Sequence, residues 1–144
     1  MDEAMQEKVA KRLKEGWLKN WMMIEVLAVS AEAARSALDG HVAKLAKEEK
    51  TLVYAKKFGE IKRVENPLPT VPVGYTHVAE LDLLTQDYET LVMLVMNYAP
   101  SSVEILEPDK IRMDMAEAQG ILNSLSETLH KFAAAGLGGV VIRS

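Results

Sequence analysis

The chain has 144 residues, about half of them apolar (49%), and a formal net charge of −4. A chain of this length buries roughly two-thirds of the surface that it exposes when unfolded, so we expect one domain with a substantial core. The absence of cysteine excludes disulfides, thiol catalysis and metal sites with sulfur ligands. Because the net charge is slightly negative, the protein surface as a whole is not expected to bind nucleic acid.

Residues 1–21 have the pattern of an amphipathic helical arm, with a helix expected over residues 3–20. Apolar residues recur at the spacing of one helix face, and basic residues crowd the other side. The apolar side carries Met5, Val9, Leu13, Trp17 and Trp21. This charged segment has no apolar core of signal-peptide length, so no secretory leader is expected and the cytoplasm is the default location. The longest apolar run, residues 91–96, is too short to span a membrane.

Residues 22–74 predict a strand, a helix, a second strand and a loop. The run MMIEVLAV at 22–29 is nearly continuous in apolar residues and of strand length. Ser30 suits a helix N-cap, and a helical face follows over residues 31–49, with Gly40 as a weak point. Residues 51–65 alternate as a long strand with a bulge near Gly59, and the three prolines of NPLPTVPVG predict a loop.

The second half repeats this order. Strand patterns over residues 75–84 and 101–107 flank a helix over residues 86–98. Asp114 and Glu117 have the spacing of a capping box and open a helix that runs past Phe132. The segment GLGG then ends that helix, and VVIR at 140–143 predicts a short last strand.

The order β-α-β-β-α-β over residues 22–107 predicts an α+β fold, a ferredoxin-like α/β sandwich. In this fold both helices cover one face of a four-stranded sheet, and the other face is open. We therefore expect an N-terminal helical arm (1–21) and a ferredoxin-like domain (22–144) with a C-terminal helix-strand extension. Another open α/β arrangement is the alternative.

The stretch HVAELDLL at 77–84 alternates acids with apolar residues, which places Glu80 and Asp82 on the open face if the leucines face the helices. The same alternation adds Glu25 from the first strand and Glu104 from the last. Four carboxylates on neighbouring strands need counter-charge. Lys56 on the second strand, the basic arm and a bound divalent cation are three candidates, and a solvated face balanced by lysines is the simplest interpretation.

No catalytic motif is found. The sequence lacks the GxSxG, Walker A and GxGxxG patterns, and His41, His77 and His130 lack the spacing of a shared metal site. No catalytic residue, resident metal or cofactor is therefore predicted. The helix over residues 86–98 is apolar on more than one side, so Met93 and Met96 join the arm residues as candidate subunit contacts. We expect a homo-oligomer, in the simplest case a dimer formed through the arm or the sheet face.

The phrase NYAPSSVEILEPDKIR, residues 97–112, resembles the helix, turn and strand near the C-terminus of WYL-type ligand-sensing regulators. Their G-P-x-x-x-V-x-x-P pattern recurs here with Ala99 in the place of the usual glycine. The resemblance implies a small regulatory or ligand-sensing module and carries no binding residue onto this sequence.

These patterns together favour a non-enzymatic, oligomeric domain that binds a small ligand or a protein partner through the open sheet face and the arm. One alternative is an enzyme that uses the carboxylates of that face, with or without a divalent metal. The other alternative is nucleic-acid contact through the basic arm. The sheet face itself argues against RNA binding, because it carries acids where RNA-binding sheets carry aromatic residues.

Overall fold

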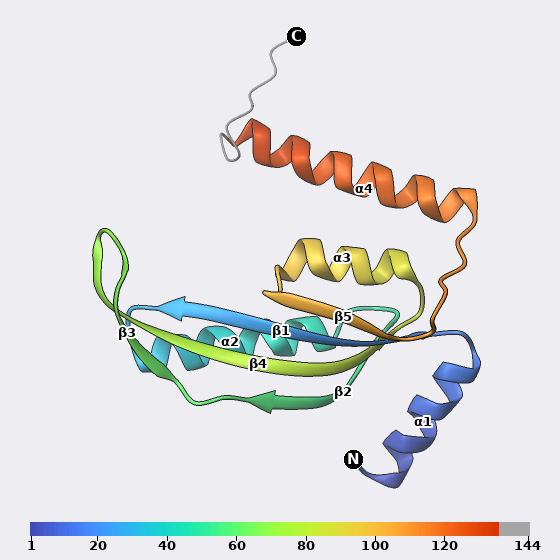
Figure 1. The fold of residues 1–144 in the computed structure, drawn as a ribbon, viewed down its shortest axis with the longest axis horizontal. Helices are drawn as coiled ribbons and strands as arrows, with labels where there is room; N and C mark the ends of the chain where they lie inside the picture. The colour runs from blue at the N-terminus through green and yellow to red at the C-terminus, as the bar shows by residue number, and fades with distance from the viewer. Residues whose placement is uncertain (136–144) are drawn as a thin grey trace.

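The computed structural model describes residues 1–135, and the strand predicted at residues 140–143 lies outside them (Figure 1). Within this part of the chain, five strands form one antiparallel sheet, and four helices complete an α+β fold. In chain order the elements are α1 (Glu3–Lys14), β1 (Leu18–Ala28), α2 (Ala31–Ala46), β2 (Thr51–Phe58), β3 (Lys62–Leu68), β4 (Val71–Thr85), α3 (Tyr88–Tyr98), β5 (Ser102–Glu107) and α4 (Met115–Ala134).

The strand order in the sheet is β2-β4-β1-β5, and β3 also pairs with β4 beyond the end of β2. β1 and β4 form the centre of the sheet and pair in register from Leu18 opposite Thr85 to Ala28 opposite Tyr75. α2 packs on these two strands. Figure 1 shows α3 beside β5 and α4 one layer further out, while α1 lies at the end of the sheet where β1 begins.

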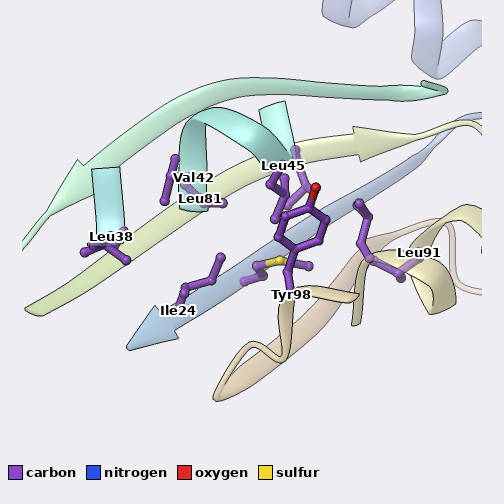
Figure 2. Packing of buried hydrophobic residues seen from close by; sticks show 11 residues of the cluster. Ile24, Leu38, Val42, Leu45, Leu81, Leu91 and Tyr98 are labelled. Atoms are coloured by element: carbon purple, nitrogen blue, oxygen red, sulfur yellow. The ribbon is translucent and has the colours of Figure 1, made fainter. Parts of the chain in front are cut away.

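The main core lies between the sheet and the helices α2 and α3. Alternate residues of the two central strands point into it, including Met22 and Ile24 of β1, which are almost fully buried. Figure 2 shows Ile24 and Leu81 of the sheet beneath the side chains of α2, with Leu91 and Tyr98 of α3 beside them. The α2 contribution to this core is Leu38, Val42 and Leu45.

Each helix begins at a side chain that replaces a missing backbone hydrogen bond. Asp2, Ser30, Asp87 and Asp114 precede α1, α2, α3 and α4, and each accepts a hydrogen bond from the backbone N–H three residues later. Such caps satisfy donors that have no partner within the first turn of a helix. The caps predicted at Ser30 and Asp114 are confirmed.

The first helix is shorter than predicted, and the first strand begins earlier. α1 ends at Lys14 because Gly16, with φ of 93°, adopts the left-handed conformation that commonly closes a helix. β1 then begins at Leu18, and its core side alternates with a second side from that point. Trp21 therefore lies on β1, and its prediction as a residue of the helical arm is wrong.

The prediction of a loop over residues 66–74 is also wrong. These residues form most of a hairpin, because β3 runs to Leu68 and β4 starts at Val71. The ladder is irregular between Glu65 and Leu68, where Asn66 has φ of 50° and Pro67 follows. An irregular edge strand tolerates a proline because no neighbour needs its missing N–H. The predicted long strand over residues 51–65 is divided into β2 and β3 at Gly59.

Candidate functional site

Helix α1 covers one end of the sheet face that α2 and α3 leave open. Val9 of α1 is buried in a small second core with Leu52 of β2 and Leu84 of β4. Partly buried side chains surround these three residues, namely Met5, Leu13, Trp17 and Tyr54. The arm thus packs within its own chain. The subunit-interface role suggested for Met5, Val9, Leu13 and Trp17 stays a prediction, but their apolar side already has a partner.

The rest of this sheet face, called the open face below, has no helix of the described chain over it. It carries side chains of the central strands that alternate with the core residues, and residues of β2 and β5 at its two borders. Its members are Trp21, Met23, Glu25 and Leu27 of β1, Val78, Glu80 and Asp82 of β4, Lys57 of β2, and Glu104 of β5.

Trp21 lies at the centre of the acids on the open face. It stands opposite Asp82 on one side and opposite Glu104 on the other. Its indole Nε1 donates a hydrogen bond to Oε1 of Glu80 at 3.2 Å. Because adjacent strands are about 4.8 Å apart, Asp82 and Glu104 are separated by roughly 10 Å with the tryptophan between them. The carboxylates therefore surround an aromatic ring and do not converge on one point.

Glu25 stands at the margin of this group. It is exposed and lies opposite Val78, two residues further along β1 than Met23, which is opposite Glu80. Within residues 1–135, no three His, Asp or Glu side chains come together as potential metal ligands. The cation site considered for Glu25, Glu80, Asp82 and Glu104 is therefore not formed by this arrangement.

The lysine next to the acids is Lys57 and not Lys56. A register shift between Val53 and Ala55 places Lys56 opposite Leu81, on the helix side, and Lys57 opposite Glu80. One extra residue in a strand moves every later side chain to the other face. Alternation counted from Thr51 cannot reveal this bulge, so the sequence assigned the counter-charge to the wrong lysine.

Direct charge compensation of the open face is weak. The ion pairs found in residues 1–135 join Arg12 to Glu15, Arg63 to Glu65 and Lys131 to Glu127, so none of them reaches an open-face acid. The nearby acids act on Tyr54, at the border with α1. Burial raises the pKa of its hydroxyl, and the charges of Asp82 and Glu107 raise it further. Glu80, Asp82 and Glu104 therefore have no ion-pair partner among the described residues.

The two methionines predicted as subunit contacts differ in how far they are covered within the chain. Met93 is exposed, whereas Met96 lines an apolar cavity of about 240 Å³ between α3, β5 and α4. Other side chains of that cavity include Val92, Val103 and Leu125. The second apolar side of α3 is thus partly covered by α4. The interface role of Met93 and Met96 stays a prediction.

Two of the histidines, His41 and His77, contact backbone carbonyl groups of other segments. The Nε2 atom of His77 lies 3.0 Å from the carbonyl oxygen of Gly59, where β2 gives way to β3. The Nε2 atom of His41 lies 2.9 Å from the carbonyl oxygen of Tyr98 at the end of α3. The Tyr98 hydroxyl donates a hydrogen bond to Glu48 at 3.0 Å. Burial raises the pKa of this hydroxyl, and the contact with Glu48 raises it further. These contacts are structural in kind.

A second cavity, about 340 Å³, lies where α3 and α4 begin and was not predicted. Its lining combines Asp87 and Glu117 with Lys110 and Arg112. The Oε2 atom of Glu117 is buried without a hydrogen-bond partner. Burial raises the pKa of this carboxyl, and the neighbouring charges of Asp87, Asp114 and Glu89 raise it further. The capping position of Glu117 was readable from the sequence, but its burial was not.

The comparison with protein families gives one match. The model of the MJ0538 family matches residues 19–143, which is most of the chain. This chain belongs to the MJ0538 family. The match overturns the suggested resemblance to WYL-type regulators. The phrase that carried it spans the end of α3 and β5, where Ala99 has φ of 45° in the position after the helix that commonly holds glycine.

No match was found in the comparison with curated proteins or in the comparison with solved structures. In the described part of this MJ0538 family member, no helix is both long enough and apolar enough to cross a membrane. The family description names no activity, so the functional argument depends on the open face and the cavities.

Proposed function

We propose that this protein is a non-enzymatic interaction module whose open face binds a basic, partly apolar segment of a partner protein. The observation that carries the proposal is Trp21, which lies between Asp82 and Glu104 and donates to Glu80. A tryptophan surrounded by carboxylates offers a lysine or arginine both an ion pair and the face of an aromatic ring. A cation over such a ring gains about 1 kcal/mol at an exposed site.

The neighbours of Trp21 favour a peptide over a nucleic acid. Met23 and Val78 are partly buried on the same face, and Leu27 is 43% exposed. These side chains suit the apolar residues of an extended segment. A phosphate backbone would instead meet Glu80, Asp82 and Glu104, and like charges repel. The basic side chains of α1 keep nucleic-acid contact as a separate prediction.

We also propose that the sheet with α2 and α3 is ferredoxin-like. The strand order β5-β1-β4-β2 supports this, with antiparallel neighbours and one helix in each of the connections from β1 to β2 and from β4 to β5. In such an arrangement the open face is a recurrent place for partners. That analogy concerns the fold and assigns no ligand.

Two model peptides test the proposed function, one alternating lysine with leucine and one alternating glutamate with leucine. The Trp17→Phe background leaves Trp21 as the one fluorescent tryptophan, so binding is read at the open face. We expect the lysine peptide to bind and the glutamate peptide not to bind. The double variant Glu80→Gln, Asp82→Asn should weaken binding about tenfold, or about 1.4 kcal/mol.

The matched control is Glu60→Gln with Glu127→Gln, which removes the same charge from exposed acids elsewhere. It should change the affinity less than twofold. Equal weakening by both double variants would mean that the peptide senses only net charge. Failure of the lysine peptide to alter Trp21 fluorescence at low salt would contradict the proposal outright.

A small-molecule site at the α3 and α4 N-termini is the second candidate function. The buried, unpartnered Oε2 of Glu117 supports it, together with Lys110 and Arg112 in the same 340 Å³ cavity. Pockets of this size hold small metabolites. An amino acid would match the cavity, with its carboxylate at the basic residues. A thermal-shift series with free amino acids tests this, and stabilisation that survives Arg112→Gln would contradict the assignment.

A further inference from the structure

The outermost helix, α4, presents an apolar stripe that the described chain leaves largely exposed. Its members follow one another at intervals of three and four residues, from Met115 through Ala118, Leu122, Leu125 and Leu129 to Phe132. This is the heptad spacing by which two helices pack along a common seam. Figure 1 shows α4 as the layer furthest from the sheet.

Packing on α3 uses a neighbouring side of α4 and leaves the stripe exposed. Ile121 is the buried residue of α4, and Gly120 lies directly against the carboxylate of Glu89 on α3. Leu125 lines the cavity between α4, α3 and β5. In contrast, Leu122 is 61%, Leu129 67% and Phe132 50% exposed. A helix side with this much exposed leucine and phenylalanine is typical of a protein contact.

We propose that the α4 stripe is a homodimer interface, in which α4 of a second copy packs against it about a two-fold axis. The exposed positions that flank the seam, Gln119 and Ser126, are uncharged. Two identical helices can therefore approach without like-charge repulsion, as a two-fold contact requires. The charged residues Glu127 and Lys131 pair with each other on a different side of the helix.

The exposed area of the stripe fits a second copy. Exposed side chains of this size leave roughly 500 Å² of apolar surface on one α4. Two copies together bring about 1,000 Å², which is near the lower bound for a stable specific interface. Val103 and Leu106 of β5 are also exposed, at 41% and 42%, and lie at the free edge of the sheet. This proposal is independent of the partner proposed for the open face.

Sedimentation equilibrium of the full chain tests the proposal directly. The wild type should form dimers at micromolar concentrations, and Leu122→Ser with Leu129→Ser should weaken the association at least tenfold. The matched control is Val29→Ser with Leu68→Ser, which removes exposed apolar side chains that do not belong to α4 and should leave the association unchanged. If the serine variant does not fold, Leu122→Ala with Leu129→Ala gives the same comparison.

A wild-type chain that stays monomeric at high concentration would overturn the proposal, and so would a serine variant that dimerises as tightly as the wild type. Residues 136–144 are the other candidate cover for the stripe. A chain ending at Ala135 distinguishes the two: equal dimerisation supports a second copy, whereas a monomeric full chain and a dimeric truncated chain would assign the cover to the C-terminal segment.

Discussion

Helices α2 and α4 carry the same kind of amphipathic pattern, yet only α2 has its apolar side covered. Leu38 and Leu45 of α2 are 0% exposed, whereas Leu122 and Leu129 of α4 are 61% and 67% exposed. α2 packs on the central strands, while α4 packs on α3, one layer further from the sheet. The period of the apolar residues therefore shows which side of a helix requires cover and does not show which chain provides that cover.

The largest expected effect comes from truncating one leucine in each of these two helices. Leu38→Ala should lower the free energy of unfolding by about 3 kcal/mol, because it leaves a cavity in a fully packed core. Leu122→Ala should lower it by less than about 0.5 kcal/mol in dilute solution, where its side chain faces water. Urea unfolding measures both. Similar losses would mean that the α4 stripe is covered within one chain.

The next test concerns the contacts between α2, the residues after it and α3. Tyr98→Phe removes the hydrogen bond to Glu48 and should cost about 1 kcal/mol at neutral pH. The pKa of Tyr98 is raised in the folded state, so its stabilising contribution is present below the ordinary pKa of 10.0 and is lost as pH rises above it. The difference between wild type and variant should shrink accordingly in urea unfolding above pH 10.

Tyr75→Phe is the control for this test, because it removes a tyrosine hydroxyl from β4, away from the contact with Glu48. Its effect on unfolding should stay small at neutral pH. A Tyr98→Phe variant as stable as the wild type would show that the contact between Tyr98 and Glu48 adds nothing to the packing of α3.

The smallest expected effects come from replacing one glycine by alanine in each of the helices α2 and α4. Gly40 of α2 has open space where a Cβ would stand, so Gly40→Ala should raise the free energy of unfolding by about 1 kcal/mol. In α4, a Cβ at Gly120 would meet the Glu89 carboxylate, which is the mobile end of a long side chain. Gly120→Ala should therefore gain less, and thermal unfolding compares the two. A loss above about 1 kcal/mol at Gly120 would indicate a rigid contact between α4 and α3.

The sequence predicted the elements whose signals are local. Ser30 and Asp114 were identified as caps because a short polar side chain precedes an apolar helical pattern. The acids of β4 were placed by simple alternation, and Glu80, Asp82 and Glu104 do share one face. These features depend on a few consecutive residues, so tertiary packing does not alter them.

The sequence failed where a single residue changes the count. The left-handed Gly16 ends α1 early and moves Trp21 from the arm to the centre of the open face. The bulge after Val53 places Lys57, and not Lys56, opposite Glu80 on the open face. A bulge has no reliable local signal, because its position depends on how two distant strands fit together. The exposure of α4 was missed for a similar reason, since its pattern resembles that of a covered helix.

Amide hydrogen exchange at two protein concentrations tests the difference between α2 and α4 most directly. α2 is covered within the chain, so the protection of its amides should not change with concentration. α4 is completed by a second copy, so its amides should exchange quickly in dilute solution and become protected as dimers form. Equal, concentration-independent protection of both helices would contradict the account.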